Sequence, residues 1–231
     1  MDEAKLRDNL ADVRRRMADA RHRAGRRPDD VRLVAVTKTV GPDAIRALQA
    51  LGLREIGENR VQDALRKQET LEGRLGLRWH MIGHLQTNKA RHALRLFDAV
   101  DSVDSVRLAR ELDRRAARDG LGPVPVLLEC NVSGEGTKHG FPPGELPAAL
   151  DAILPLERLA VEGLMTMAPL VADAEATRPL FAALRELAEE ARRRTGRPLP
   201  HLSMGMTQDF EVAIEEGATM VRIGSALFRG T

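Results

Sequence analysis

Eight short apolar segments alternate with helix-like segments along this chain, and this repeat restricts the fold more than any other feature of the sequence. The apolar segments have the length and composition of strands, and they span residues 31–38, 54–58, 79–83, 99–103, 124–131, 159–167, 201–205 and 220–223. The segments between them predict helices over residues 43–51, 60–71, 86–96, 105–118, 145–154, 174–194 and 208–216. Strand–helix units with parallel crossovers form either an open doubly wound sheet or a closed barrel.

The number of units favours the closed barrel. The open alternative commonly carries a nucleotide-binding loop, but the first turn here, residues 38–42 (KTVGP), contains neither G-x-G-x-x-G nor a Walker sequence. The nearest glycine cluster, at residues 134–140, has the wrong spacing and is expected to form a loop at the barrel mouth. We therefore predict the α/β class with a (β/α)₈ TIM barrel.

Ahead of the barrel, residues 3–24 predict an amphipathic helix. Its apolar residues recur at spacings of four, three and four between charged residues, at Leu6, Leu10, Val13 and Met17. Gly25 and Pro28 end this pattern. We expect residues 1–231 to form a single barrel domain, with the helix of residues 1–25 packed on the barrel rather than extended as a coiled-coil arm.

Charge and composition argue against several classes of function. The 36 basic and 34 acidic residues leave a formal charge of +2, and they are interleaved along the predicted helices. Aromatic residues make up only 3% of the chain, so the stacking surfaces used by single-stranded nucleic-acid binders are missing. The lone cysteine, Cys130, suits a reducing compartment, and neither a signal-peptide core nor a membrane-spanning segment is evident. We expect a soluble cytoplasmic protein without nucleic-acid or membrane partners.

A lysine ends the first predicted strand. Period-2 alternation places Val34, Val36 and Lys38 on one face of the strand. In a (β/α)₈ barrel the active site lies at the carboxyl ends of the strands, and closure makes the last strand the neighbour of the first. Lys38 is therefore expected beside the last two loops, either as a solvated rim charge or as a reactive amine.

Those two loops have the features of a phosphate site. Barrels of this kind commonly bind phosphate in the loops after strands seven and eight. After the seventh strand, Thr207 is placed to cap the predicted helix 208–216, so that backbone N–H groups face the mouth. After the eighth, Gly224 allows a close backbone approach, Ser225 adds a hydroxyl, and Arg222 shares the parity of Gly224. With the strand-end lysine these residues predict a site for an aldehyde cofactor that carries a phosphate. The other interpretation of Arg222 is an ion pair at the barrel rim.

Motifs along nearly the whole chain resemble one known family. They are VAVTK (34–38), GENRVQ (57–62), WHMIGHLQTNKAR (79–91), GLMTM (163–167), LSMGMTQDFEVAI (202–214) and GATMVRIGSALFRG (217–230). The chain resembles the pyridoxal 5′-phosphate (PLP) homeostasis proteins, which are single-domain relatives of the N-terminal barrel of alanine racemase. Thr207 stands where the motif more often has serine, and Ser225 where threonine is common; both substitutions keep a hydroxyl.

The resemblance implies PLP as cofactor, held as a Schiff base on Lys38, and a role in intracellular PLP homeostasis and delivery without robust catalytic turnover. It also implies contacts for Ser203, Met204, Gly224 and Ser225 with the phosphate, for Arg222 with the pyridine nitrogen and for Asn59 near the ring hydroxyl. No residue is assigned a catalytic or metal-binding role. PLP-dependent apo-enzymes are candidate recipients of the cofactor, and we expect a monomer, with a weak dimer left open.

Two features of the sequence argue against turnover. An arginine stays protonated, so Arg222 beside the ring nitrogen would leave that nitrogen unprotonated and the ring a poorer electron sink. The chain also contains no tyrosine, whereas the racemase that it resembles uses a tyrosine of a second domain as its other base. Racemisation would need another base, for which the candidates are His80, His84, His139 and Cys130.

Three alternatives remain open at this point. A PLP-dependent amino-acid racemase or related carbanion enzyme would use the same lysine, a Schiff-base aldolase would attack a sugar phosphate directly, and a nucleic-acid binder would show steep salt dependence. His80 and His84 span a strand and its exit, so we expect no metal pair, and His84 is placed to border the cofactor. Cys130 is expected to be a small buried residue.

Overall fold

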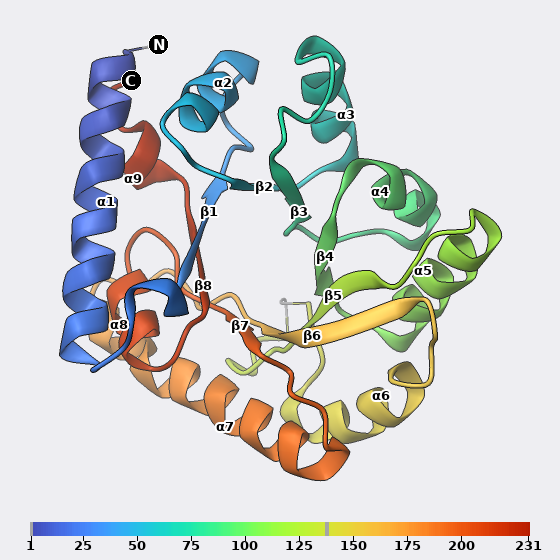
Figure 1. Ribbon diagram of the computed structural model, residues 1–231. Coiled ribbons are helices and arrows are strands. Elements are labelled where there is room, and N and C mark those ends of the chain that lie inside the picture. The colour runs from blue at the N-terminus through green and yellow to red at the C-terminus, as the bar shows by residue number, and fades with distance from the viewer. Residues whose placement is uncertain (1, 137–138) are drawn as a thin grey trace.

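The computed structural model describes residues 2–136 and 139–231. Eight parallel strands form a closed barrel in which the strands pair in chain order and β8 pairs with β1 (Figure 1). The strands are β1 (Arg32–Val36), β2 (Glu55–Glu58), β3 (Arg78–Met81), β4 (Ala99–Val103), β5 (Val124–Glu129), β6 (Leu159–Met165), β7 (His201–Ser203) and β8 (Met220–Ile223). The predicted (β/α)₈ barrel is confirmed.

Helices form a ring around the barrel (Figure 1). They are α1 (Glu3–Arg23), α2 (Pro42–Ala50), α3 (Val61–Thr70), α4 (Ala90–Leu96), α5 (Val106–Arg118), α6 (Leu146–Ile153), α7 (Arg178–Thr195), α8 (Phe210–Glu215) and α9 (Ser225–Phe228). Short 3₁₀ turns precede four of the elements: η1 (Pro28–Asp30), η2 (Thr87–Lys89), η3 (Pro143–Glu145) and η4 (Ala174–Thr177).

Several elements are shorter than the sequence predicted. β1 ends at Val36, two residues before Lys38. The strands β3, β5, β6 and β7 also end two residues early, because ladder pairing stops where the chain turns away at the rim. The helices predicted over 86–96 and 174–194 each begin with a 3₁₀ turn instead. Of the loop predicted at residues 134–140, residues 137–138 lie outside the described residues.

Apolar side chains form two layers, one inside the barrel and one outside it. The inner cluster consists of Val34, Leu127, Met165 and Met220. The larger outer cluster lies between the strands and the surrounding helices and includes the fully buried Trp79, Phe181 and Phe210. Each such aromatic ring removes a large apolar area from water, so the outer layer supplies most of the hydrophobic stabilisation of the fold.

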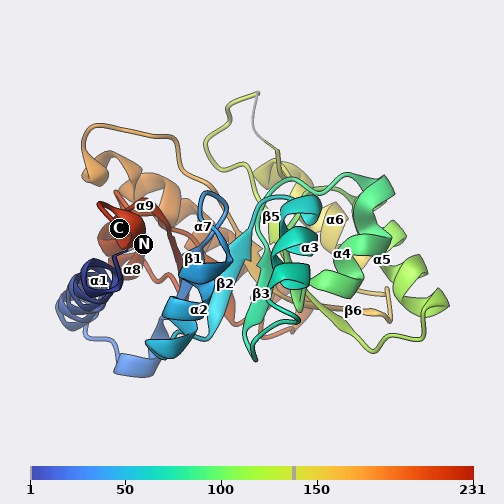
Figure 2. The same cartoon turned by 90° about the horizontal axis from the view of Figure 1, so that it is seen from above.

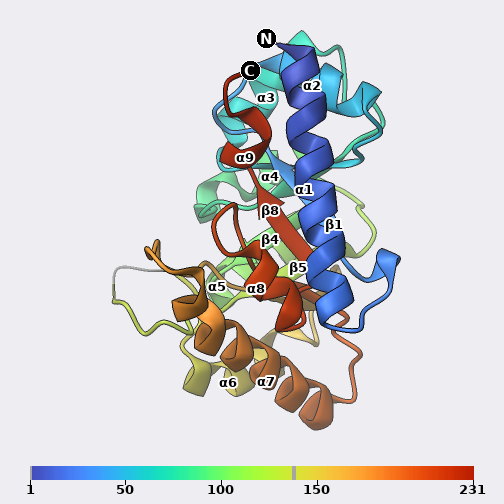
Figure 3. The same ribbon diagram turned by 90° about the vertical axis from the view of Figure 1, so that its left-hand side faces the viewer.

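Helix α1 packs along the side of the barrel where the chain ends, against α8 and α9 (Figure 2 and Figure 3). The predicted apolar stripe is buried, from Leu6 to Met17. Asn9 Nδ2 donates to the carbonyl oxygens of Leu227 and Arg229 at 2.9 and 3.0 Å, and Arg16 pairs with Glu211 at 2.7 Å. The two ends of the chain are therefore held together. Within the described residues no helix is long and apolar enough to cross a membrane.

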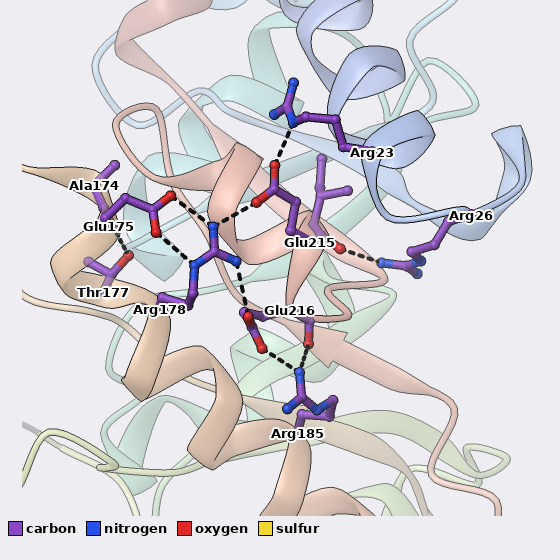
Figure 4. Close-up of polar contacts among 10 residues, drawn as sticks. Arg23, Arg26, Ala174, Glu175, Thr177, Arg178, Arg185, Glu215 and Glu216 are labelled. Atoms are coloured by element: carbon purple, nitrogen blue, oxygen red, sulfur yellow. Dashed lines mark hydrogen bonds and ion pairs between the residues drawn. The ribbon is translucent and has the colours of Figure 1, made fainter.

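A network of charged side chains fixes α8 between α7 and α1. Arg178 at the start of α7 contacts Glu175, Glu215 and Glu216, with nitrogen–oxygen distances of 2.7 to 3.0 Å (Figure 4). Glu215 also pairs with Arg23 at the end of α1, at 2.7 Å. Single exposed ion pairs stabilise proteins little, whereas a connected network restrains geometry. Here the network holds the helix that follows the β7 loop.

A second polar network fills the barrel at the amino ends of the strands. His80 Nδ1 lies 2.9 Å from Asp101 Oδ2, and His80 Nε2 lies 3.1 Å from Glu55 Oε2. Arg32 pairs with Glu55 at 3.2 Å, and its Nη2 lies 2.7 Å from His201 Nε2. Burial alone would lower the pKa of His80, but the two carboxylates outweigh it and raise the pKa to about 9. Burial and Arg32 lower the pKa of His201 to about 4.

We expect the protein to lose stability between pH 7 and 10 through His80. The folded-state pKa of about 9 lies above the ordinary value of 6.5, so the stabilisation is complete below pH 6.5 and is lost as the pH rises through 9. The shift corresponds to about 3 kcal/mol of unfolding free energy. Denaturant titrations at pH 7 and 10 should show this loss, and His80→Gln should remove it. The exposed His22→Gln is the control, and an unchanged pH dependence in His80→Gln would contradict the assignment.

Candidate functional site

One pocket at the carboxyl ends of the strands collects residues from β1 and β8 and from the loops after β1, β6, β7 and β8. Its volume is about 250 Å³. It is lined by Val36, Lys38, Thr39, Leu170, Met206, Thr207, Gln208, Asp209, Arg222, Gly224 and Ser225. The pocket therefore lies where barrels of this class bind ligands and phosphate groups.

Lys38 lies in a tight turn just beyond β1 and is exposed into this pocket. The Val40 N–H donates to the Thr37 carbonyl oxygen at 3.0 Å, which closes the turn around Lys38 and Thr39. The strand was predicted to run to Lys38, and that boundary is wrong. The expectation that Lys38 lies beside the last two loops is confirmed, because β1 pairs with β8.

Arg222 extends from β8 along the floor of the pocket and is only 3% exposed. Its Nη1 donates to Ser203 Oγ at 2.6 Å, and its Nη2 donates to the Thr166 carbonyl oxygen at 2.8 Å. Within the described residues no carboxylate lies within 4 Å of the guanidinium, so the alternative of a rim ion pair is not what this structure has. Burial lowers the pKa of Arg222, while more distant carboxylates act in the opposite direction.

The loops after β7 and β8 are joined at the pocket edge. A Cβ atom at Gly224 would lie 3.3 Å from both the carbonyl oxygen and the Cβ atom of Val36, so glycine permits the close contact with β1. Ser225 begins α9 and is exposed. Thr207 Oγ1 accepts from the Ala226 N–H at 3.3 Å. The predicted capping role of Thr207 is wrong: α8 begins at Phe210, two residues later than predicted.

Three of the predicted contact residues do not line this pocket. Ser203 is fully buried behind it and contacts Arg222. Met204 points outward into the hydrophobic core, because side chains alternate along a strand, and its N–H donates to the Met220 carbonyl oxygen at 3.1 Å. Asn59 lines a separate pocket of about 260 Å³ with His84 and Lys89, at the carboxyl ends of β2 and β3.

His84 and His139 stack near that second pocket, with ring centroids 3.9 Å apart and planes 12° apart. Both face Asp104, whose Oδ2 lies 2.8 Å from His84 Nδ1 and 3.8 Å from His139 Nδ1. Metal ligation needs imidazole lone pairs, which lie in the ring planes, to converge on one point, and stacked parallel rings do not provide this. His80 belongs to the polar network at the amino ends of the strands and lies away from His84. Cys130 is buried as expected, and burial raises the pKa of its thiol.

Sequence reasoning missed Glu129, a titratable group inside the mouth. It ends β5, is 2% exposed, and its Oε2 has no hydrogen-bond partner among the described residues. Burial and the charge of Asp104 raise its pKa to about 7, against the effect of Arg222. Period-2 alternation in the sequence could have found it: Glu129 and Leu127 lie on the same face of β5, and Leu127 faces the barrel interior.

Comparison with known proteins places the chain in a family. Residues 2–231 match the family described as alanine racemase, N-terminal domain. The chain belongs to this family. It is 45% identical over 221 residues to the pyridoxal phosphate homeostasis protein of Aquifex aeolicus, covering 96% of both chains. It is 44% identical to the protein of the same name from Pseudomonas aeruginosa, covering 96% of this chain and 94% of the relative.

Two solved structures share the fold of this chain. PipY of Synechococcus elongatus, in a structure with PLP bound, superposes with a TM-score of 0.85 at 38% identity, covering 96% of this chain and 99% of PipY. An alanine racemase of Clostridium difficile superposes with a TM-score of 0.74 at 15% identity, covering 97% of this chain and 56% of the racemase. The second comparison supports only the shared barrel.

Proposed function

We propose that this protein binds PLP in the pocket of Lys38, holds it as a Schiff base on that lysine, and takes part in PLP homeostasis by storing and delivering the cofactor. The observation that carries the proposal is the convergence of Lys38, Arg222 and Ser225 on one small pocket at the carboxyl ends of β1, β8 and β7. The names of the two relatives and the bound PLP of PipY support the same ligand.

The residues of the pocket fit the chemistry of PLP. The Ser225 and Thr207 hydroxyls and the close backbone at Gly224 suit a phosphate group, and the charged Arg222 lies on the floor. PLP supplies an aldehyde carbon: the Lys38 amine adds to it, and the carbonyl oxygen leaves as water. Ser203 acts through Arg222 in this proposal, and Asn59 contributes from the neighbouring pocket. Met204 has no contact with the ligand in this proposal, because its side chain packs in the outer core and its N–H donates to the Met220 carbonyl oxygen.

We propose that the protein does not turn over a substrate. A buried, charged Arg222 disfavours a protonated pyridine nitrogen, and the chain has no tyrosine. Of the other candidate bases, Cys130 is buried with a raised pKa and His80 lies at the opposite end of the barrel. PLP-dependent apo-enzymes are the proposed recipients of the cofactor. We also propose that residues 1–231 form a single domain.

The test is a visible absorption spectrum of the purified protein with added PLP, followed by borohydride reduction and peptide mass mapping. We expect a yellow band that disappears on reduction and a pyridoxyl mass on Lys38. The chain has only five lysines, at positions 5, 38, 67, 89 and 138, so the mapping is unambiguous. A protein that stays colourless would overturn the proposal and favour the sugar-phosphate aldolase. Exchange of the α-proton of added amino acids in D₂O would instead favour the racemase.

A further inference from the structure

A buried ion pair lies directly beneath the turn that carries Lys38. Lys67 of α3 donates from Nζ to Glu58 Oε1 at 2.6 Å, and Glu58, the last residue of β2, is fully buried. The Lys67 side chain is only 11% exposed. Neither residue lines the pocket, so the pair does not contact a ligand there.

Both members of the pair also bind the residue that precedes Lys38. Lys67 Nζ donates to the Thr37 carbonyl oxygen at 2.7 Å, and Thr37 Oγ1 donates to Glu58 Oε1 at 2.5 Å. The Thr37 N–H donates to the Gly57 carbonyl oxygen at 3.1 Å. The donor and acceptor groups of Thr37 are thus all bound, and Thr37 is completely buried.

The same Thr37 carbonyl oxygen begins the turn around Lys38. It accepts one hydrogen bond from the Lys67 ammonium and another from the Val40 N–H, which closes the turn. Lys38 is the first residue after this anchored carbonyl, and its own side chain is exposed. A shift of the Thr37 carbonyl would therefore shift the origin of the Lys38 side chain relative to Arg222 and Ser225.

Stability alone does not account for such a pair. Taking two charges out of water costs several kcal/mol per ion in effective terms, and replacing a buried pair with apolar residues of similar volume is often neutral or stabilising. Fixing one arrangement of the chain is the better attested use of buried ionic groups. What this pair fixes is the backbone at residue 37.

We propose that Glu58 and Lys67 are positioning residues that aim the Lys38 amine at the PLP aldehyde. This inference rests on the proposed function. It distinguishes two parts of binding: the pocket walls from β7 and β8 recognise the phosphate and ring, and the Glu58–Lys67 pair determines whether the bound aldehyde is captured covalently.

The test compares PLP with pyridoxine 5′-phosphate, which has the same ring and phosphate but an alcohol in place of the aldehyde. In the double variant Glu58→Leu/Lys67→Met, we expect affinity for pyridoxine 5′-phosphate to stay within about twofold, while covalent capture by Lys38, measured by borohydride reduction and mass, falls roughly tenfold. The matched control is Asp63→Leu/Arg66→Met, which removes an exposed ion pair from the same helix and should change neither.

A second variant covers the case in which the double variant does not fold. Thr37→Val keeps the shape of the side chain and removes the hydrogen bonds of its hydroxyl, to Glu58 Oε1 and, at 3.5 Å, to the Gly57 carbonyl oxygen. It should lower covalent capture roughly threefold. If a variant loses pyridoxine 5′-phosphate affinity and covalent capture of PLP equally, the pair has only a structural role and the inference is overturned. Unchanged covalent capture in the double variant would also overturn it. Absence of a Lys38 adduct in the wild-type protein would overturn the proposed function, and this inference with it.

Discussion

We expect Lys38→Ala to abolish the proposed covalent capture of PLP and to leave the fold unchanged. Only a primary amine forms an imine with the aldehyde carbon, and among the described residues Lys38 is the lysine that lines the pocket. Its side chain is exposed and has no hydrogen bond or ion pair within the described part of the chain, so its removal leaves no buried group without a partner. We expect no yellow band, no pyridoxyl adduct after borohydride, and a melting temperature close to that of the wild type.

The matched control is Lys89→Ala, which removes the lysine of the neighbouring pocket. This variant should keep both the absorption band and the adduct on Lys38. Retention of an adduct in Lys38→Ala, mapped to Lys89 or another lysine, would contradict the assignment of the reactive amine. Loss of the adduct in both variants would mean that the two pockets bind one ligand together.

We expect Gly205→Ala to destabilise the protein and to damage the pocket at the same time. Gly205 has a φ of +94°, and an added Cβ would lie 2.5 Å from Ala213 Cβ and 2.9 Å from Phe210 Cα. The left-handed conformation and the overpacking together cost roughly 2–5 kcal/mol. The Gly205 carbonyl also accepts from the Arg222 N–H at 3.0 Å, so relief of the clash moves the floor residue of the pocket.

Thermal unfolding and PLP titration measure the two consequences of Gly205→Ala. We expect a melting temperature lower by roughly 5–15 °C and a weaker affinity for PLP. The control is Gly122→Ala in the loop before β5, where an added Cβ meets nothing within 4 Å and φ is not positive. A Gly205 variant as stable as the Gly122 variant would show that the loop adapts without cost.

Several parts of the site were predictable because they depend on short-range patterns. Period-2 alternation gave the inward parity of Arg222 and Gly224, and the closure of eight strands made β8 the neighbour of β1. The prediction that Lys38 lies beside the last two loops is therefore correct, although β1 stops two residues earlier than predicted.

Other parts depend on where the chain leaves each strand, and sequence periodicity does not define that point. The loop after β7 runs to Asp209, whose side chain accepts the Met206 N–H at 2.6 Å, so α8 starts later than predicted and Thr207 contacts the β8 loop instead. Met204 lies one residue beyond Ser203, and alternation turns it toward the helices. Asn59 comes directly after β2 and lines a different pocket.

The barrel, the apolar stripe of α1, the family and the lysine at the mouth could all be predicted from the sequence, because each of these follows from local periodicity, strand order or a contiguous motif. The contacts between charged groups, in contrast, could be seen only in the folded barrel. His80 contacts Asp101 and Glu55 inside the barrel, toward the amino ends of the strands. Lys67 of α3 donates to Glu58 and to the Thr37 carbonyl oxygen. Such contacts join residues that are distant in sequence through strand register, backbone turns and side-chain rotamers, and these are set when the whole barrel closes.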